Sequence, residues 1–201
     1  MVRVIVATDS PSRADVQALL AEHLTDMFAT SPADSVHALD HEALAADGVA
    51  FLSARAPDGT LLGCGALVEL EATSPRDEGG TRAGHGELKS MRTAPAARGR
   101  GVASAVLRRL LGTARERGYG RVSLETGSQE FFAPARSLYT RHGFAPCGPF
   151  GSYREDPNSV FMTLELAART DSGAVPGRAT VGSCASKPLP ATSPPSPSTP
   201  S

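Results

Sequence analysis

The sequence has almost no net charge and no long apolar run. Its 201 residues carry a formal charge of -1 at pH 7, which gives no electrostatic reason to expect a nucleic acid or an anionic membrane as a partner. No apolar run approaches the roughly 20 residues that a membrane-spanning helix needs. The segment Met1-Val2-Arg3-Val4-Ile5-Val6 is too short for a signal peptide and predicts a first strand.

Cysteine is sparse, and its pattern argues against two kinds of site. The three cysteines, Cys64, Cys147 and Cys184, are an odd number, lie far apart and lack the spacing of metal ligands. Reduced thiols in a cytoplasmic protein are the simplest interpretation. We therefore expect a cytoplasmic location and no bound metal.

The last part of the chain lacks the apolar pattern of a folded domain. Periodicity stops near Ala168, and residues 185–201 are almost entirely Pro, Ser, Thr and Ala. Such a segment cannot bury enough apolar surface to offset the entropy lost on ordering it. We therefore predict one folded domain over residues 1–167 and a disordered tail over residues 168–201.

Strand and helix signals alternate through this domain. Asp9 or Ser10 can cap a helix with Pro11 in its first turn, and Pro57-Asp58-Gly59 is a hairpin signal. The expected elements are strands at 1–6, 49–54, 61–70, 87–93, 121–126, 144–147 and 159–166, helices at 11–28, 35–46, 102–117 and 134–142, and a polar loop at 71–86. The strands on either side of the helix at 102–117 should be parallel, so the order predicts a mixed α/β sheet.

The most informative segment joins the strand at 87–93 to the helix that follows it. Its sequence is Arg98-Gly99-Arg100-Gly101-Val102-Ala103, a glycine-bearing loop that leads directly into a helix. Backbone N–H groups in such a loop are unpaired and point one way, with the positive end of the helix dipole behind them. Arg98 and Arg100 add fixed positive charge. The segment therefore predicts a site for a phosphate or pyrophosphate group.

Three kinds of phosphate loop have sequence patterns that this segment could match. A Walker loop needs Gly-Lys-Ser/Thr, whereas Val102-Ala103 follows Gly101 here. A dinucleotide loop needs G-x-G-x-x-G/A after the first strand of a doubly wound sheet; the segment has Ser104 at the last of these positions and lies in mid-chain, so it matches only in part. The third pattern, R-x-x-G-x-A, is met by Arg98, Gly101 and Ala103.

With a second segment downstream, the sequence resembles the GNAT superfamily of acetyl-CoA-dependent N-acetyltransferases. The segment Ala135-Arg136-Ser137-Leu138-Tyr139-Thr140-Arg141-His142-Gly143-Phe144 is similar to the family pattern A-x-x-L-Y-x-x-x-G-F. The loop and this segment cover about residues 87–144. The runs at 31–39 and 156–162 are similar to an uncharacterised bacterial branch of the superfamily.

The resemblance implies a fold and an activity. The fold is an α/β (α+β) GNAT fold, with a mixed central sheet and flanking helices. The activity is direct acetyl transfer, in a ternary complex, from acetyl-CoA to a primary amine of a small molecule or amino-acid-like acceptor. A non-catalytic acyl-CoA-binding module is the alternative, and the resemblance leaves a homodimer open as the quaternary state.

The resemblance also implies how the coenzyme is held. Backbone N–H groups of the loop would bind its pyrophosphate, and the edge of the strand at 87–93 would pair with its pantetheine arm. A bulge in that strand would direct an N–H near Met91 at the thioester carbonyl. The expected cofactor-binding residues are Met91, Arg92, Thr93, Arg98, Gly99, Arg100, Gly101, Val102, Ala103 and Ser104. One departure is Phe132, where many members carry an asparagine that contacts the coenzyme.

Two residues are expected to act in catalysis. Tyr139 matches the family tyrosine that would protonate the leaving thiolate, and its alternative is a packed tyrosine on a helix face. Glu87 lies where some members carry the base that deprotonates the amine, and its alternative is a solvated carboxylate at a strand end. Glu125, on the neighbouring strand, is a second candidate for the base, because a carboxylate on a buried strand is costly unless it is used or paired. Expected substrate contacts are His37, Glu125, Tyr153 and Asn158. His142 is expected at the end of its helix.

Overall fold

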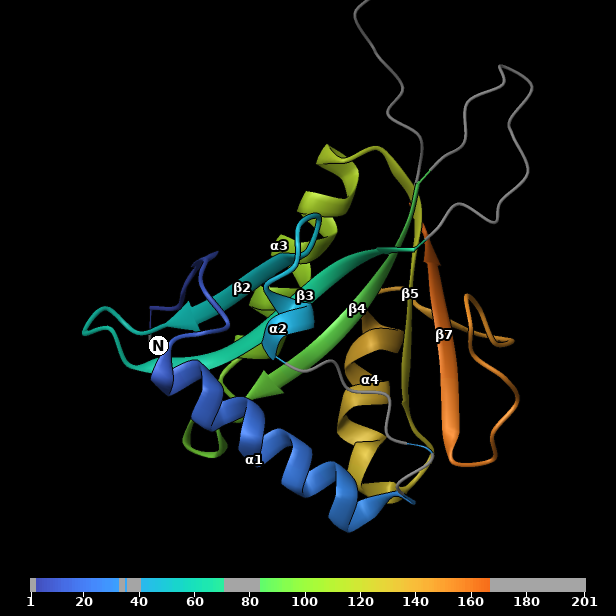
Figure 1. Ribbon diagram of the computed structural model, residues 1–201, viewed down its shortest axis with the longest axis horizontal. Helices are drawn as coiled ribbons and strands as arrows, with labels where there is room; N and C mark the ends of the chain where they lie inside the picture. The colour runs from blue at the N-terminus through green and yellow to red at the C-terminus, as the bar shows by residue number, and fades with distance from the viewer. Residues whose placement is uncertain (1–2, 33–34, 36–40, 71–83, 167–201) are drawn as a thin grey trace, which may run out of the picture. The chain divides into compact units, whose positions relative to one another are not determined.

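The computed structural model describes residues 3–32, 35, 41–70 and 84–166 (Figure 1). All of these residues belong to one unit of the chain, Met1–Arg169. The elements in chain order are β1 (Ile5–Thr8), α1 (Ala14–Thr30), α2 (His41–Leu44), β2 (Ala50–Arg55), β3 (Leu61–Leu70), β4 (Gly84–Thr93), the short 3-10 turn η2 (Pro95–Ala97), α3 (Val102–Glu116), β5 (Tyr119–Gly127), the 3-10 turn η3 (Glu130–Phe132), α4 (Ala133–Arg141), β6 (Ala145–Cys147) and β7 (Ser159–Glu165).

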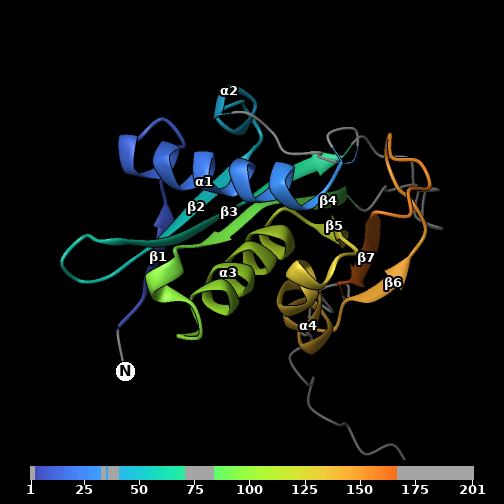
Figure 2. The ribbon, with the colours of Figure 1, turned by 90° about the horizontal axis from the view of Figure 1, so that it is seen from below.

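The strands form one mixed sheet of seven, in the order β1-β2-β3-β4-β5-β7-β6. β4 and β5 are parallel and are joined through α3, while the other neighbours are antiparallel. Helices α1 and α2 cover one face of the sheet, and α3 and α4 cover the other (Figures 1 and 2). The predicted mixed sheet with flanking helices and a parallel strand–helix–strand unit is therefore confirmed.

The two parallel strands pair over only part of their length. Their pairing begins at Gly84 and Tyr119 and ends at Leu88 and Leu124. Past this point β4 continues beside β3, and β5 continues beside β7 as far as Gly127. The sheet therefore divides between β4 and β5 at the end that leads into α3.

A bulge lies in β4 just past this division. Cys64 is opposite Arg92 and Ala66 is opposite Lys89, so two residues of β4 oppose Gly65 alone. Among the described residues Ser90, at φ 52°, is the one non-glycine residue with a positive φ. A Cβ on Gly65 would overlap the Sδ atom of Met91, so the absence of a side chain at Gly65 leaves space for the Met91 side chain. The bulge expected near Met91 is present.

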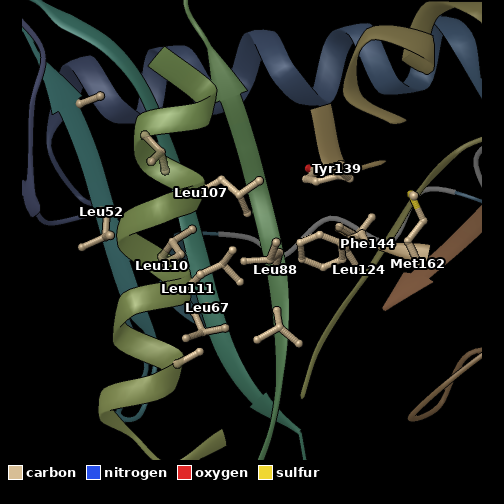
Figure 3. Close-up of a cluster of buried hydrophobic side chains, with 14 of the residues drawn as sticks. Leu52, Leu67, Leu88, Leu107, Leu110, Leu111, Leu124, Tyr139, Phe144 and Met162 are labelled. Atoms are coloured by element: carbon tan, nitrogen blue, oxygen red, sulfur yellow. The ribbon is translucent and has the colours of Figure 1, made fainter. Parts of the chain in front are cut away.

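α3 packs its apolar face against the sheet. Its buried residues are Val102, Val106, Leu107, Leu110, Leu111 and Ala114, all of which the helical periodicity predicts. Figure 3 shows the leucines of α3 beside Leu88 of β4 and Leu67 of β3. Burying a leucine side chain of this kind contributes about 1.5–3 kcal/mol to folding. This packing fixes the start of α3, and with it the glycine loop, against β4.

Several boundaries differ from the sequence-based expectation, including those of β1, which spans Ile5–Thr8 instead of residues 1–6, and α2, which ends at Leu44 instead of residue 46. α1 begins at Ala14 rather than near Pro11, because the Asp9 carboxylate accepts hydrogen bonds from Ser53 Oγ at 2.6 Å and Arg55 Nη2 at 2.8 Å instead of capping the helix. β4 begins three residues earlier than predicted, inside the expected loop. A Cβ on Gly84 or Gly86 would lie within 3.0 Å of the Tyr119 ring. The strand therefore has glycine at these two positions because the aromatic ring packs directly against its backbone.

Other expectations fall partly outside the described residues. Within the described part of the chain, no helix has the length and apolar character to cross a membrane. Cys64 and Cys147 are free thiols, as predicted. Cys184, residues 36–40 of the second helical region, residues 71–83 of the polar loop and the tail at 168–201 lie outside the described residues.

Candidate active site

A cleft of about 510 Å³ opens where β4 and β5 divide. The bulged half of β4, the glycine loop, the first turn of α3, η3 and one side of α4 line it, together with His23 of α1. The expected cofactor-binding residues that line this cleft are Met91, Arg92, Thr93, Arg98, Gly99, Gly101, Val102, Ala103 and Ser104. Arg100 is exposed and is not one of its lining residues. One cleft thus brings together nine of the ten predicted positions.

The backbone of the loop requires glycine at two positions. Gly99 has φ 73° and Gly101 has φ 79°, and a Cβ on either would meet nothing within 4 Å. Conformation rather than space therefore favours glycine there. Gly101 is the N-cap of α3, so no capping side chain satisfies the first N–H groups of the helix. These groups open onto the cleft with the positive end of the helix dipole, which suits an anion.

The end of α4 meets the start of α3 beside this loop. His142 is the residue at the C-terminal end of α4, as expected, and its Nε2 atom lies 2.7 Å from Ser104 Oγ. Arg108 Nη1 donates to the same hydroxyl at 2.9 Å. Burial lowers the pKa of His142, with the charges of Arg108 and Arg141 as further causes, which favours its neutral form. Sequence reasoning did not find the contact between Ser104 and His142, because it joins two helices far apart in the chain.

A second cavity, of about 90 Å³, adjoins the cleft. It is lined by the C-terminal half of α1, by β4 just before and at the bulge, and by the end of β5. Its charged lining residues are Lys89 and Glu125. The residues that line both the cleft and this cavity are His23, Met91, Phe132, Ala135 and Tyr139. A group that passes between ligands in the two spaces must pass beside these residues.

Tyr139 lies at this junction. It is buried on α4, and its ring meets Phe144 edge-on with a centroid distance of 5.7 Å (Figure 3). Burial raises the pKa of its hydroxyl, and the negative charge of Glu125 raises it further. The phenol is therefore protonated at neutral pH and can donate a hydrogen bond. It is a packed tyrosine and a cavity residue at once, so the two sequence-based interpretations are not exclusive.

Glu87 belongs to a buried polar cluster instead of a cavity wall. Its Oε1 atom accepts a hydrogen bond from Tyr153 Oη at 2.6 Å and lies 3.0 Å from Lys89 Nζ, which also donates to Tyr153 Oη. Only 4% of Glu87 is exposed, so a solvated carboxylate at a strand end is ruled out. Burial raises the pKa of the Tyr153 hydroxyl, as does the neighbouring Glu87 carboxylate. Lys89 is the member of this cluster that reaches the small cavity.

The remaining expected substrate residues are separated by the fold. Glu125 lines the small cavity and accepts a hydrogen bond from Ser159 Oγ at 2.7 Å. Asn158 donates to Asp156 and to Ser35, which lines the small cavity, but Asn158 itself lines neither space. His37 lies outside the described residues.

α1 supplies site residues that sequence reasoning did not select. His23 lines both spaces, and burial lowers its pKa to about 4, with the charge of Arg92 as a second cause. Arg92 Nη2 forms an ion pair with Asp26 at 2.7 Å, which ties α1 to β4. Arg92 Nε is buried without a hydrogen-bond partner in the described part of the chain. The one sequence feature that could have identified His23 as a site residue is its position as a polar residue on the apolar side of a helix.

Comparison with sequence families places these features in a known group. The model of the acetyltransferase (GNAT) family matches residues 16–144, a range that begins within α1 and includes the glycine loop and α4. The uncharacterized N-acetyltransferase YsnE of Bacillus subtilis is 47% identical over 161 residues, which cover 80% of this chain and 99% of YsnE. The IAA acetyltransferase of Azospirillum brasilense is 38% identical over 169 residues, covering 83% of this chain and all of that protein (100%).

Solved structures agree with the sequence relatives. A Klebsiella pneumoniae protein assigned to the acyl-CoA N-acyltransferases superposes with a TM-score of 0.61 and 29% identity, over 82% of this chain and 98% of the other. Arabidopsis thaliana NAA60, solved in complex with acetyl-CoA, superposes with a TM-score of 0.61 over 82% of this chain and 99% of its own. At 17% identity, the second likeness concerns the fold alone.

Proposed function

This chain belongs to the acetyltransferase (GNAT) family, and we propose that it transfers the acetyl group of acetyl-CoA directly to a primary amine of a small acceptor. The observation that carries this proposal is the pair of adjoining spaces that share Met91 and Tyr139. One space has an anion-binding loop at its edge, and the other is small and contains charged side chains. Two ligands held in this way could react in a ternary complex.

The residues of the large cleft fit a coenzyme A thioester. The uncapped start of α3 suits its pyrophosphate, and Arg98 supplies a positive charge beside it. Beyond Leu88, β4 has no pairing with β5, so its edge can bind the pantetheine arm as an added strand. The bulge at Ser90–Met91 would direct a backbone N–H at the thioester oxygen, where negative charge develops during transfer.

Proton transfers would involve residues on the two sides of the junction. Tyr139 would donate to the leaving sulfur. Because its pKa is raised, we assign it mainly a hydrogen-bonding role that stabilises the developing thiolate. The amine must lose a proton, and of the two expected carboxylates Glu125 lines the small cavity whereas Glu87 does not. We therefore assign proton acceptance to Glu125, and to Glu87 the orientation of Lys89.

The acceptor must suit a cavity of about 90 Å³. Its charged lining residues are Lys89, whose ammonium group is paired with Glu87, and Glu125, whose carboxylate can accept a hydrogen bond from a cationic group. This arrangement favours a small acceptor that arrives as an ammonium ion. IAA belongs in the first acceptor panel as well, because one relative at 38% identity is an IAA acetyltransferase.

A release assay for free coenzyme A tests the proposal. The purified chain is mixed with acetyl-CoA and a panel of small primary amines, amino acids and IAA, and thiol is measured over time. We expect at least one amine to raise thiol release far above the rate of hydrolysis. Tight binding of acetyl-CoA with no acceptor-dependent release would instead support the non-catalytic acyl-CoA-binding module.

A further inference from the structure

Two adjacent phenylalanines precede α4, and they differ in which of the two spaces they line. Phe132 lines both the large cleft and the small cavity, whereas Phe131 lines the cleft alone and is 47% exposed. Their rings meet edge-on, with centroids 5.0 Å apart and an interplanar angle of 87°. Phe132 therefore holds a position at the junction that its neighbour does not share.

The Phe132 ring packs directly against Gly127, the last residue of β5. A Cβ at this position would lie closer than 3.0 Å to two ring carbons and 2.6 Å from Gln129 Oε1. Gly127 does not have a positive φ, so the glycine serves this close approach and not an unusual backbone conformation. Arg136 Nη1 donates to the carbonyl oxygens of Gly127 and Gln129 at 2.7 and 2.9 Å, which fixes the turn beneath the ring.

The Phe132 ring lies at the junction of the two spaces, through which a transferred acyl group would pass. Of the residues that line both spaces, Met91 and Tyr139 would contact the thioester carbonyl and sulfur, His23 is polar and Ala135 is small. Phe132 is the largest apolar side chain among them and has no part in the proton transfers. Its ring therefore bounds the space beyond the carbonyl carbon. The adjoining cavity of about 90 Å³ must also admit the amine, so it leaves little room for a longer acyl chain.

We propose that Phe132, held on Gly127, restricts the donor to short acyl groups and so determines which acyl-CoA the enzyme uses. This inference rests on the proposed function, because it takes the large cleft as the coenzyme site. It assigns to one side chain the preference for acetyl-CoA over thioesters with two or more additional methylene groups.

Binding of acetyl-CoA and butyryl-CoA, measured by titration calorimetry, tests this assignment without an acceptor. We expect the wild-type chain to bind acetyl-CoA at least tenfold more tightly. In Phe132→Ala, the two additional methylene groups of butyryl-CoA gain an apolar site, and each should improve binding about fourfold. The ratio of the two dissociation constants should therefore shift by about 15-fold toward butyryl-CoA. Phe131→Ala is the matched control, and it should change both affinities by the same factor. Phe132→Leu, which keeps an apolar group, should give an intermediate shift.

The outcomes separate this inference from the proposed function. An unchanged ratio in Phe132→Ala and Phe132→Leu proteins with cooperative thermal unfolding would overturn the role of Phe132, as would an equal shift in Phe131→Ala. Failure of the wild-type chain to bind either thioester would overturn the coenzyme cleft and the inference with it. The expected ratios without turnover of any amine would leave the inference standing and contradict the proposed transfer.

Discussion

Replacing Gly101 by glutamate should abolish acetyl-CoA binding while leaving the fold intact. Gly101 has φ 79°, so any side chain there costs about 1–2 kcal/mol of stability. A Cβ would meet nothing within 4 Å, so no steric clash with the fold adds to that cost. The glutamate carboxylate would project at the uncapped start of α3. A like charge about 4 Å from a bound phosphate near a protein surface costs about 4 kcal/mol, or about a thousandfold in affinity.

Two matched variants separate strain from charge. Gly101→Ala introduces the same backbone strain without the carboxylate, so it should lose the same stability yet retain much more of the affinity. Gly118→Ala carries the strain at φ 73°, at the far end of α3, and a Cβ there also meets nothing within 4 Å. Titration calorimetry with acetyl-CoA and denaturant unfolding would measure the two effects. Wild-type affinity in a folded Gly101→Glu protein would refute the assignment of the loop to the coenzyme.

Three further predictions concern the junction and the buried histidine. Tyr139→Phe should lower kcat about a hundredfold with little change in acetyl-CoA affinity, and an unaltered kcat in steady-state assays would count against the donor role. Glu125→Gln should lower kcat with an amine by at least a hundredfold, whereas Glu87→Gln should lower it less than tenfold; the reverse order would return the base role to Glu87. Burial lowers the pKa of His85 to about 4, well below its unfolded value of about 6.5, so its neutral form favours folding above pH 6.5 and that stability is lost as pH falls toward 4. The loss should be about 3 kcal/mol larger in the wild-type chain than in His85→Gln in unfolding experiments, and equal pH dependence of the two proteins would contradict it.

The sequence was sufficient to predict the parts of the fold that depend on local patterns. The apolar face of α3, the hairpin at Pro57-Asp58-Gly59 and the loop into α3 all follow from residues close together in the chain. The start of α1 was predicted too early, because Asp9 binds Ser53 and Arg55 of β2, over 40 residues away. Gly84 and Gly86 were assigned to a loop, although they form a strand against Tyr119.

The site was predictable on the coenzyme side and less so on the acceptor side. The loop residues are contiguous, so one motif finds most of the cleft. The small cavity is assembled from α1, β4, β5 and α4, and no single motif contains His23, Lys89 and Glu125. The sequence also does not show that Lys89 and Tyr153 engage Glu87. Only the fold distinguishes the two carboxylates, because Glu125 lines the small cavity whereas Glu87 lies in a buried polar cluster.

Acetyl transfer to an amine is proposed to take place between the two adjoining spaces of the active site. Mass spectrometry of products formed from acetyl-CoA with an isotopically labelled acetyl group, in the presence of the amine panel, tests it most directly. We predict that the label appears on the nitrogen of at least one small amine with the wild-type chain and is much reduced with Glu125→Gln. Labelled acetate as the sole product, formed at the same rate with and without amines, would contradict the claim.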